Sequence, residues 1–459
     1  MGQPQPEPGP GAGGSRELLK LALPLIVSNS FLTLQLTIDR VMLSRQNSDA
    51  VGAAMVAAVM YWTPFALLQF TASYAATFVA QYVGAGRPNR VGPAVWQALY
   101  FGLAAGLLFL LLRPLAGPLM ALAGHDARVQ TLEVAYFQVL CFAALPMLVV
   151  AATNAFFAGR GDTWPVLLTD GIGVAVNATL CYAWINGHWG FPALGIVGAG
   201  WATVCSACVA AVIGLAQMLR AKHRRAFATL SGWRPDRELF LRMMRFGLPS
   251  GMQYFLEAMA FNIFLVLMGR LGATPLAASS IAFTINTTAL VPMLGLSQAV
   301  SVLVGQRLGM NRPDLAAKTT LRGVGWCLLY TLANAIVFVG IPGPLLLLFQ
   351  DSDAQRWAAV GPLVPGLLRF VAVYCLFECV SLVLSAALRG AGDTRFVSLA
   401  TLAFSWAVMV LPALLASRYG GGLYLNWVFA TAYLIVLSFV FVWRFRQGKW
   451  RSMRVIEAG

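Results

Sequence analysis

The chain has 459 residues, of which 59% are hydrophobic and only 11% are charged. A soluble domain carries about 25% charged residues, so the composition excludes an ordinary soluble protein and indicates a chain that lies in a membrane along most of its length. The net charge of +15 is compatible in principle with a nucleic-acid-binding protein. However, the basic residues lie in short loops between apolar segments, where they report membrane topology, and we expect no nucleic-acid partner.

Twelve apolar segments are each long enough to cross about 30 Å of hydrocarbon at about 1.5 Å per residue. We expect helices at residues 18–44, 50–83, 93–122, 131–158, 164–186, 194–219, 239–270, 276–308, 316–348, 358–388, 396–417 and 423–446. The chain is therefore predicted to be an all-α polytopic membrane protein with two six-helix lobes, at residues 17–219 and 243–446. Residues 1–16 are expected to be disordered, residues 220–242 to form a basic linker, and residues 447–459 to form a tail.

The two predicted lobes repeat one another. Leu23-Pro24 recurs as Leu248-Pro249, and the segment 81–89 recurs at 306–314 with the same offset of 225 residues. Two facing membrane repeats are typical of secondary transporters, whose site lies between them. The repeat predicts that Pro24 and Pro249 occupy equivalent places and that the first and seventh helices flank one central cleft.

Lysine and arginine are concentrated in the even-numbered loops, in the linker and in the tail. The positive-inside rule places such loops in the cytoplasm, and both termini with them. Because each half contains an even number of helices, the two halves should insert the same way up, related by an axis along the membrane normal.

Three acidic residues are expected inside the apolar segments: Asp39 in the first helix, Glu257 in the seventh and Glu378 in the tenth. A charged side chain at the bilayer centre costs at least about 2.5–3.5 kcal/mol, so each acid is a functional hypothesis. A carboxyl group that exchanges a proton for another cation is the chemistry that an antiporter needs. The alternative is a protonated acid that only hydrogen-bonds between helices or, for Asp39, one that pairs with Arg40.

Other polar features carry less weight. Intramembrane amides such as Asn177 more often join helices than bind ligands. The pair Cys205 and Cys208 has the spacing of a metal or redox motif, but it lies in an apolar segment without a second pair, so we expect buried core residues. The sequence contains no phosphate-binding loop, zinc-protease motif or nucleophile elbow, so we expect no enzyme activity and no cofactor.

Three motifs together resemble one known family. A proline is followed after fifteen residues by an aspartate (Pro24 to Asp39), a Gln-x-x-Gly-Ala-Gly motif begins at Gln81, and Arg-Gly-x-Gly-Asp-Thr spans residues 389–394. This pattern is similar to that of the multidrug and toxic compound extrusion (MATE) transporters, over residues 17–446. The resemblance implies a V-shaped pair of six-helix lobes.

The remaining motif residues resemble NorM-like rather than DinF-like members. Glu257 follows Pro249 by eight positions, and Glu378 precedes the Arg-Gly element where NorM-like members commonly have an aspartate. DinF-like members pair the first-helix aspartate with Asn-x-x-x-Asp in the fifth helix. Here Asn177 matches, but Cys181 stands in place of the second acid, which favours coupling through the C-terminal lobe.

The resemblance implies the export of amphipathic organic cations in exchange for Na+ or H+ across a bacterial inner membrane. Glu257 and Glu378 would then form the coupling site and a candidate Na+ site, with Asp39 and Asn177 as further cation and substrate residues. The expected partners are a small cationic amphipathic substrate and membrane lipids, and we expect a monomer. Aromatic and methionine side chains suit a lipophilic cation, although any single one of them is more often a packing residue.

Two other functions are open at this stage. A flippase for lipid-linked precursors, from the same superfamily, should line its cavity with basic residues, whereas only Arg40, Arg245 and Arg369 are expected inside spans. A membrane-embedded enzyme or scaffold would need a catalytic motif, which the sequence lacks.

Overall fold

The computed structural model describes residues 14–44, 48–121, 124–347, 349 and 354–457. Within these ranges the fold is helical throughout, and twelve helical segments are long and apolar enough to cross a membrane. The first six comprise α1 (Ser15–Ser44), α2 (Ser48–Ser73) with α3 (Ala75–Gly84), α4 (Val91–Phe109) with α5 (Ala116–Ala121), α6 (Ala127–Gly159), α7 (Trp164–Asn186) and α8 (Gly195–Met218). The second six comprise α10 (Arg237–Arg270), α11 (Ala273–Gly309), α12 (Pro313–Gly340), α14 (Ala354–Val360) with α15 (Val364–Ala391), α16 (Thr394–Phe404) with α17 (Leu411–Arg418), and α18 (Leu423–Arg446).

The predicted all-α, twelve-span fold class is confirmed. The boundaries expected at the N-terminus and in the linker needed correction. Ser15 and Arg16 already belong to α1, and the rest of the predicted disordered N-terminus, residues 1–13, lies outside the described residues. The linker contains the short helix α9 (Ala221–Phe227), and α10 begins at Arg237 because the Asp236 side chain caps it by accepting a hydrogen bond from the Leu239 amide.

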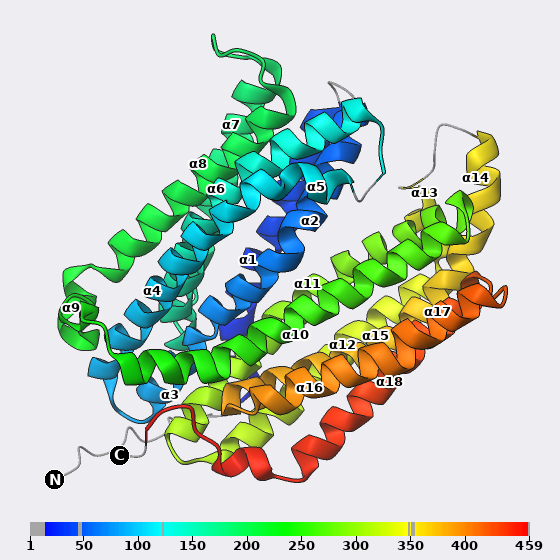
Figure 1. Ribbon diagram of the computed structural model, residues 1–459. Coiled ribbons are helices and arrows are strands. Elements are labelled where there is room, and N and C mark those ends of the chain that lie inside the picture. The colour runs from blue at the N-terminus through cyan, green and yellow to red at the C-terminus, as the bar shows by residue number, and fades with distance from the viewer. Residues whose placement is uncertain (1–13, 45–47, 122–123, 348, 350–353, 458–459) are drawn as a thin grey trace.

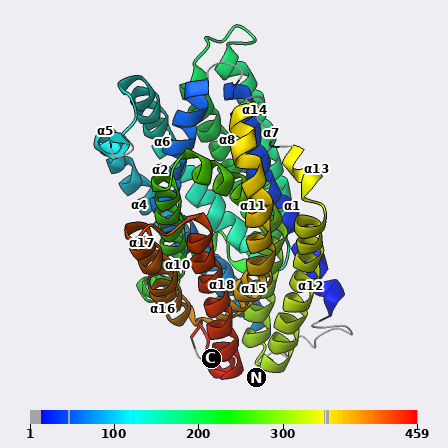
Figure 2. The same cartoon turned by 90° about the vertical axis from the view of Figure 1, so that its right-hand side faces the viewer.

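The helices form two lobes, α1–α8 and α10–α18, which lie side by side (Figures 1 and 2). The lobes meet where α1 packs along α11 and α2 packs along α10. Glycines allow both close approaches: a Cβ atom on Gly295 of α11 would lie 2.6 Å from the Ile26 side chain, and one on Gly251 of α10 would overlap the Leu67 carbonyl. The first and seventh spans therefore both lie at the lobe interface, but each packs on a helix of the opposite lobe.

The repeated motifs interlock at one end of this interface. Gln81 donates a hydrogen bond to the Gly390 carbonyl (3.0 Å), and its repeat equivalent Gln306 donates one to the Gly159 carbonyl (2.9 Å). A Cβ atom on Gly84 would overlap the carbonyl of Gln306, while one on its equivalent Gly309 would overlap the carbonyl of Gln81. We call this crosswise arrangement the motif clasp. The sequence repeat is thus also a structural repeat, because each motif binds the partner motif of the other lobe.

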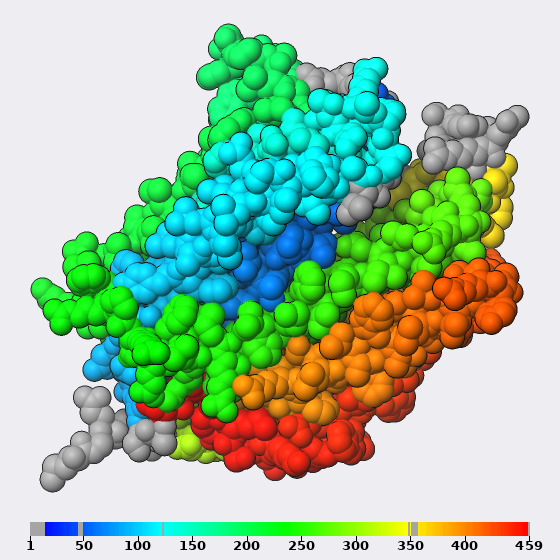
Figure 3. All heavy atoms as spheres, in the orientation of Figure 1, coloured from blue at the N-terminus to red at the C-terminus, as the bar shows by residue number. Residues whose placement is uncertain are grey.

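The clasp lies at the end of the bundle that carries the linker, the loop after α3 and the tail after α18, and we call this the basic end. Within the described residues, the hydrogen bonds and ion pairs that join the two lobes lie at the basic end or at mid-height, where Asn262 of α10 binds Thr63 of α2 and Asn29 of α1 binds Gln298 of α11. At the opposite end the lobes stand apart, and the space-filling view shows a notch between them (Figure 3). The molecule is therefore closed at the basic end and open at the other.

Candidate functional site

The two predicted acids of the second lobe come together inside it. Glu257 lies on α10 and Glu378 on α15; both are half-buried. The two side chains lie near each other and near the phenol of Tyr433 in α18. Glu378 also lies beside the Cys375 thiol, which donates a hydrogen bond to the Asn286 side chain of α11 (3.1 Å). Four helices thus position one pair of interacting carboxyl groups.

A buried arginine is linked to the first of these acids. The Glu257 carboxylate accepts a hydrogen bond from Gln253 (2.9 Å), and Gln253 in turn accepts one from the Arg389 guanidinium (2.8 Å). Arg389 is only 7% exposed and lies over the ring of Tyr254, with its central carbon 5.0 Å from the ring centroid. The helix predicted over residues 358–388 stopped one residue short of Arg389, and this boundary is wrong: Arg389 lies in the last turn of α15, inside the lobe. The positively charged side chain of Arg389 therefore belongs to the same hydrogen-bonded cluster as the Glu257 carboxylate.

The predicted residues of the first lobe also come together, at a separate place. Asp39 of α1 is 7% exposed and accepts a hydrogen bond from the Cys181 thiol of α7 (3.1 Å). Asn177 lies one turn before Cys181 and donates to the Thr203 hydroxyl of α8 (3.5 Å). Arg40 is exposed and forms no ion pair with Asp39 within the described part of the chain. Cys181 thus occupies the second-acid position as a hydrogen-bond donor to Asp39.

A family model described as MatE matches residues 24–183 and 249–415, and both matched segments begin at the repeated proline. The chain is 30% identical over 400 residues to a probable multidrug resistance protein NorM of Shewanella oneidensis, covering 86% of this chain and 85% of that one. It is 25% identical over 449 residues to the corresponding protein of Thermotoga maritima, covering 96% and 94% of the two chains. The chain belongs to the MATE family.

Solved structures agree with this assignment at the level of the fold. A structure described as the outward-facing conformation of a multidrug resistance MATE family transporter matches with a TM-score of 0.86 at 21% identity, over 95% of this chain and 97% of that one. The eukaryotic MATE transporter AtDTX14 matches with a TM-score of 0.83 at 18% identity, over 95% and 96% of the chains. The chain is a multi-pass member of this family of multidrug efflux transporters, with twelve transmembrane helices, as the sequence analysis predicted.

Two further acids of this MATE protein lie within spans, although the sequence analysis expected only three. Glu133 of α6 is fully buried and binds His125 (2.6 Å). Asp170 of α7 accepts hydrogen bonds from Ser28 of α1 and from Asn154 of α6 (3.1 Å for the latter). Both acids lie inside segments that were correctly predicted as helices, so a scan of those segments for charged residues could have found them. The hydrogen-bond partners of these two acids lie on other elements, so the sequence alone could not have identified them.

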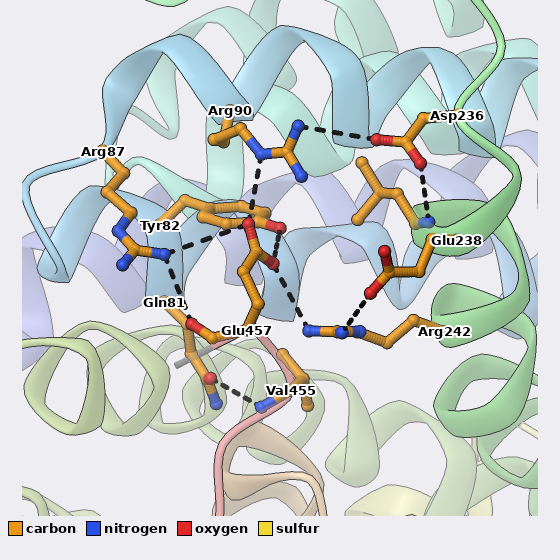
Figure 4. A network of polar contacts seen from close by, with 10 residues as sticks. Gln81, Tyr82, Arg87, Arg90, Asp236, Glu238, Arg242, Val455 and Glu457 are labelled. Atoms are coloured by element: carbon orange, nitrogen blue, oxygen red, sulfur yellow. Dashed lines mark hydrogen bonds and ion pairs between the residues drawn. The ribbon is translucent and has the colours of Figure 1, made fainter. Parts of the chain in front are cut away.

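The tail of this MATE protein closes the basic end on one side (Figure 4). Glu457 accepts hydrogen bonds from the Tyr82 hydroxyl (2.7 Å), from Arg90 (3.1 Å) and from Arg242 (3.4 Å). Burial alone would raise the pKa of Glu457, but hydrogen bonds from its own backbone and from Tyr82, together with the charge of Arg90, outweigh burial and lower it. Just before it, the Val455 amide donates to Gln81 of the motif clasp (2.8 Å).

Comparison of the two halves explains why the tail contributes the acid Glu457 at the basic end. On the other side of the interface, Glu17 of α1 binds Arg307 of α11 at 2.5 Å. With the offset of 225 residues, Glu17 corresponds to Arg242 and Arg307 corresponds to Tyr82. The repeat therefore has no acid of its own on the second side, and Glu457 of the tail supplies it by bridging Tyr82 and Arg242. We call this contact the tail strap.

Proposed function

We propose that this protein is a secondary active antiporter that exports amphipathic organic cations in exchange for Na+ or H+. The observation that carries the proposal is the pair of interacting carboxyl groups, Glu257 and Glu378, held inside the second lobe on α10 and α15. Two nearby acids titrate as one coupled pair, and burying both charges is costly. A bound proton or Na+ removes that cost, and a cationic substrate can remove it in its place.

The inter-lobe contacts give this exchange two end states. The motif clasp and the tail strap close the basic end while the other end is open. Opening the basic end requires these contacts to break while the lobes come together elsewhere. A ligand drives such a change only if it binds the two states with different affinity. We propose that the coupling cation and the substrate favour opposite states.

The proposed orientation follows from charge. The basic end carries the arginine-rich linker and the loop after α3, so the positive-inside rule places it, and both termini, in the cytoplasm of a bacterium. With the basic end closed, the structure then corresponds to a state open to the outside. We propose that the protein acts as a monomer, because each chain supplies both lobes and both halves of the clasp.

The surroundings of the acids favour a lipophilic cation as substrate. Tyr254 stacks on Phe70 across the lobe interface, with ring centroids 3.5 Å apart, and Tyr374 and Tyr433 lie near the acid pair. Aromatic faces attract cations, and the carboxyl groups supply the opposite charge. A lipid-precursor flippase should instead gather basic side chains toward its cavity. Arg40, Arg245 and Arg369 are exposed. Arg389 does lie inside the second lobe, but it is linked through Gln253 to the Glu257 carboxylate.

The experiment that tests this function is efflux from everted membrane vesicles. Ethidium uptake into vesicles should be driven by an imposed Na+ gradient or by an imposed proton gradient, and an uncoupler should abolish the proton-driven component. Vesicles without the protein set the background. If neither gradient drives transport of ethidium or of other lipophilic cations, the proposed antiport is wrong.

A further inference from the structure

Two polar contacts join α1 to α7, and they share one register. Ser28 contacts Asp170, and Asp39 contacts Cys181; each pair is separated by 142 residues. Ser28 and Asp39 are eleven residues apart, as are Asp170 and Cys181. Eleven residues make about three helical turns, so the two contacts lie on the same faces of two parallel helices, about 16 Å apart along them. The α1–α7 seam therefore carries two carboxyl groups at different depths.

The contact nearer the start of α7, between Ser28 and Asp170, forms a small polar site. The Asp170 carboxylate accepts one hydrogen bond from the Ser28 hydroxyl and another from the Asn154 amide, so three helices converge on it. The residue as a whole is half-buried. Within the described residues, no charged side chain of α1, α6 or α8 forms an ion pair or hydrogen bond with it. A carboxylate at this depth without a positive partner calls for a bound cation or a proton.

The repeat argues against a purely structural role. The Gly-x-Gly-Asp-Thr motifs at 159–163 and 390–394 align the two halves in this region, and with that alignment Asp170 corresponds to Thr401 of α16. Thr401 is fully buried in the second lobe, so the repeated fold forms at this place without a carboxyl group. The acid is therefore a property of the first lobe alone, and not part of the framework that both lobes share.

We propose that Asp170, with Ser28 and Asn154, is a second monovalent-cation site, which takes up a proton or Na+ in the first lobe. Uptake of a proton forms one O–H bond on the carboxylate and leaves the Asn154 contact in place. Uptake of Na+ uses the carboxylate, the Ser28 hydroxyl and the amide oxygen of a reoriented Asn154, which are the oxygen ligands that hard cations prefer. The proposal adds a site to the proposed antiporter and rests on that function only for its physiological purpose.

The test is infrared difference titration of the purified full-length protein in lipid nanodiscs, with K+ or with Na+ as the salt. The parental protein should show a protonated-carboxyl band that Asp170→Asn removes. In the Na+ arm the midpoint of that band should move to lower pH if Na+ competes for the site, and should stay unchanged if the site takes only protons. Difference spectra of Asp170→Asn that match the parental spectra in both salts would overturn the proposal.

A second variant covers the case in which Asp170→Asn fails to fold. Ser28→Ala keeps the carboxyl group and removes a hydrogen bond to its charged form, so the midpoint of the same band should move to higher pH. An unchanged midpoint in Ser28→Ala would contradict the site. Because the titration needs no transport, its outcome is independent of the ethidium assay, and the failure of one proposal can be told from the failure of the other.

Discussion

Replacing Glu457 by glutamine tests how the tail strap contributes to closure. The substitution keeps the size of the side chain but removes the charge that Arg90 and Arg242 contact at 3.1 and 3.4 Å. Each partly exposed ion pair contributes about 0.2–1 kcal/mol, so the two pairs together contribute about 0.4–2 kcal/mol. A loss of that size changes the ratio of closed to open molecules by a factor of about 2–30.

The assay is distance measurement by electron spin resonance between spin labels at Asn89, in the loop after α3, and Arg451, in the tail. The labels are attached through unnatural amino acids so that the seven cysteines stay in place. Glu457→Gln should broaden the distance distribution and add a longer component. The control is Glu238→Gln, which removes a contact to Arg242 (2.8 Å) within the same lobe and should leave the distribution unchanged.

The pH dependence of the same distribution checks the sign of the effect. The pKa of Glu457 is lowered in the closed state, so its contribution to closure is complete above the ordinary glutamate pKa of about 4.3 and disappears as the pH falls through the lowered value. The parental protein and Glu457→Gln should therefore differ at neutral pH and converge in acid. Identical distributions at neutral pH would refute the role of the tail strap.

Three further predictions follow from the clasp, the first-lobe acid and the topology. Gly84→Ala places a Cβ atom on a carbonyl of the other lobe and should disfavour closure by about 1–3 kcal/mol, whereas Gly325→Ala, with open space around it, should not; the same spin-label distances report both. Asp39→Asn should slow gradient-driven ethidium transport less than the second-lobe glutamine variants do, and an unchanged rate would remove Asp39 from the mechanism. A cysteine at Arg225 should resist impermeant thiol reagents in intact cells while one at Phe191 reacts; labelling of position 225 from outside would invert the topology.

The sequence predicts the spans well, because the length of an apolar run is a local property. The ends predicted for α7 and α18 coincide with the observed ends, at 164–186 and 423–446. The repeat is also visible in the sequence, but the contacts of the motif clasp, such as that of Gln81 with Gly390, are known only from the structure. Asp39 and Glu378 could be found because an acid in an apolar run stands out against its neighbours.

Contacts between distant segments could not be predicted in the same way. Glu457 is an ordinary acid in a charged tail until folding brings it to Tyr82, 375 residues earlier in the chain. Arg389 follows a long apolar run, and only the observed end of α15 at Ala391 places it inside the lobe. The acid pair itself depends on the packing of α15 and α18 around it, which no local pattern encodes.

The most direct test of the proposed mechanism is gradient-driven ethidium transport by Glu257→Gln and Glu378→Gln. Glutamine keeps the size and hydrogen bonding of each side chain but cannot exchange charge, so each variant should lose gradient-driven transport while inserting and folding as the parental protein does. Glu238→Gln, on the same helix as Glu257 but 83% exposed at the basic end, is the control and should pump normally. If both second-lobe variants transport ethidium at the parental rate, coupling through the Glu257–Glu378 pair is wrong.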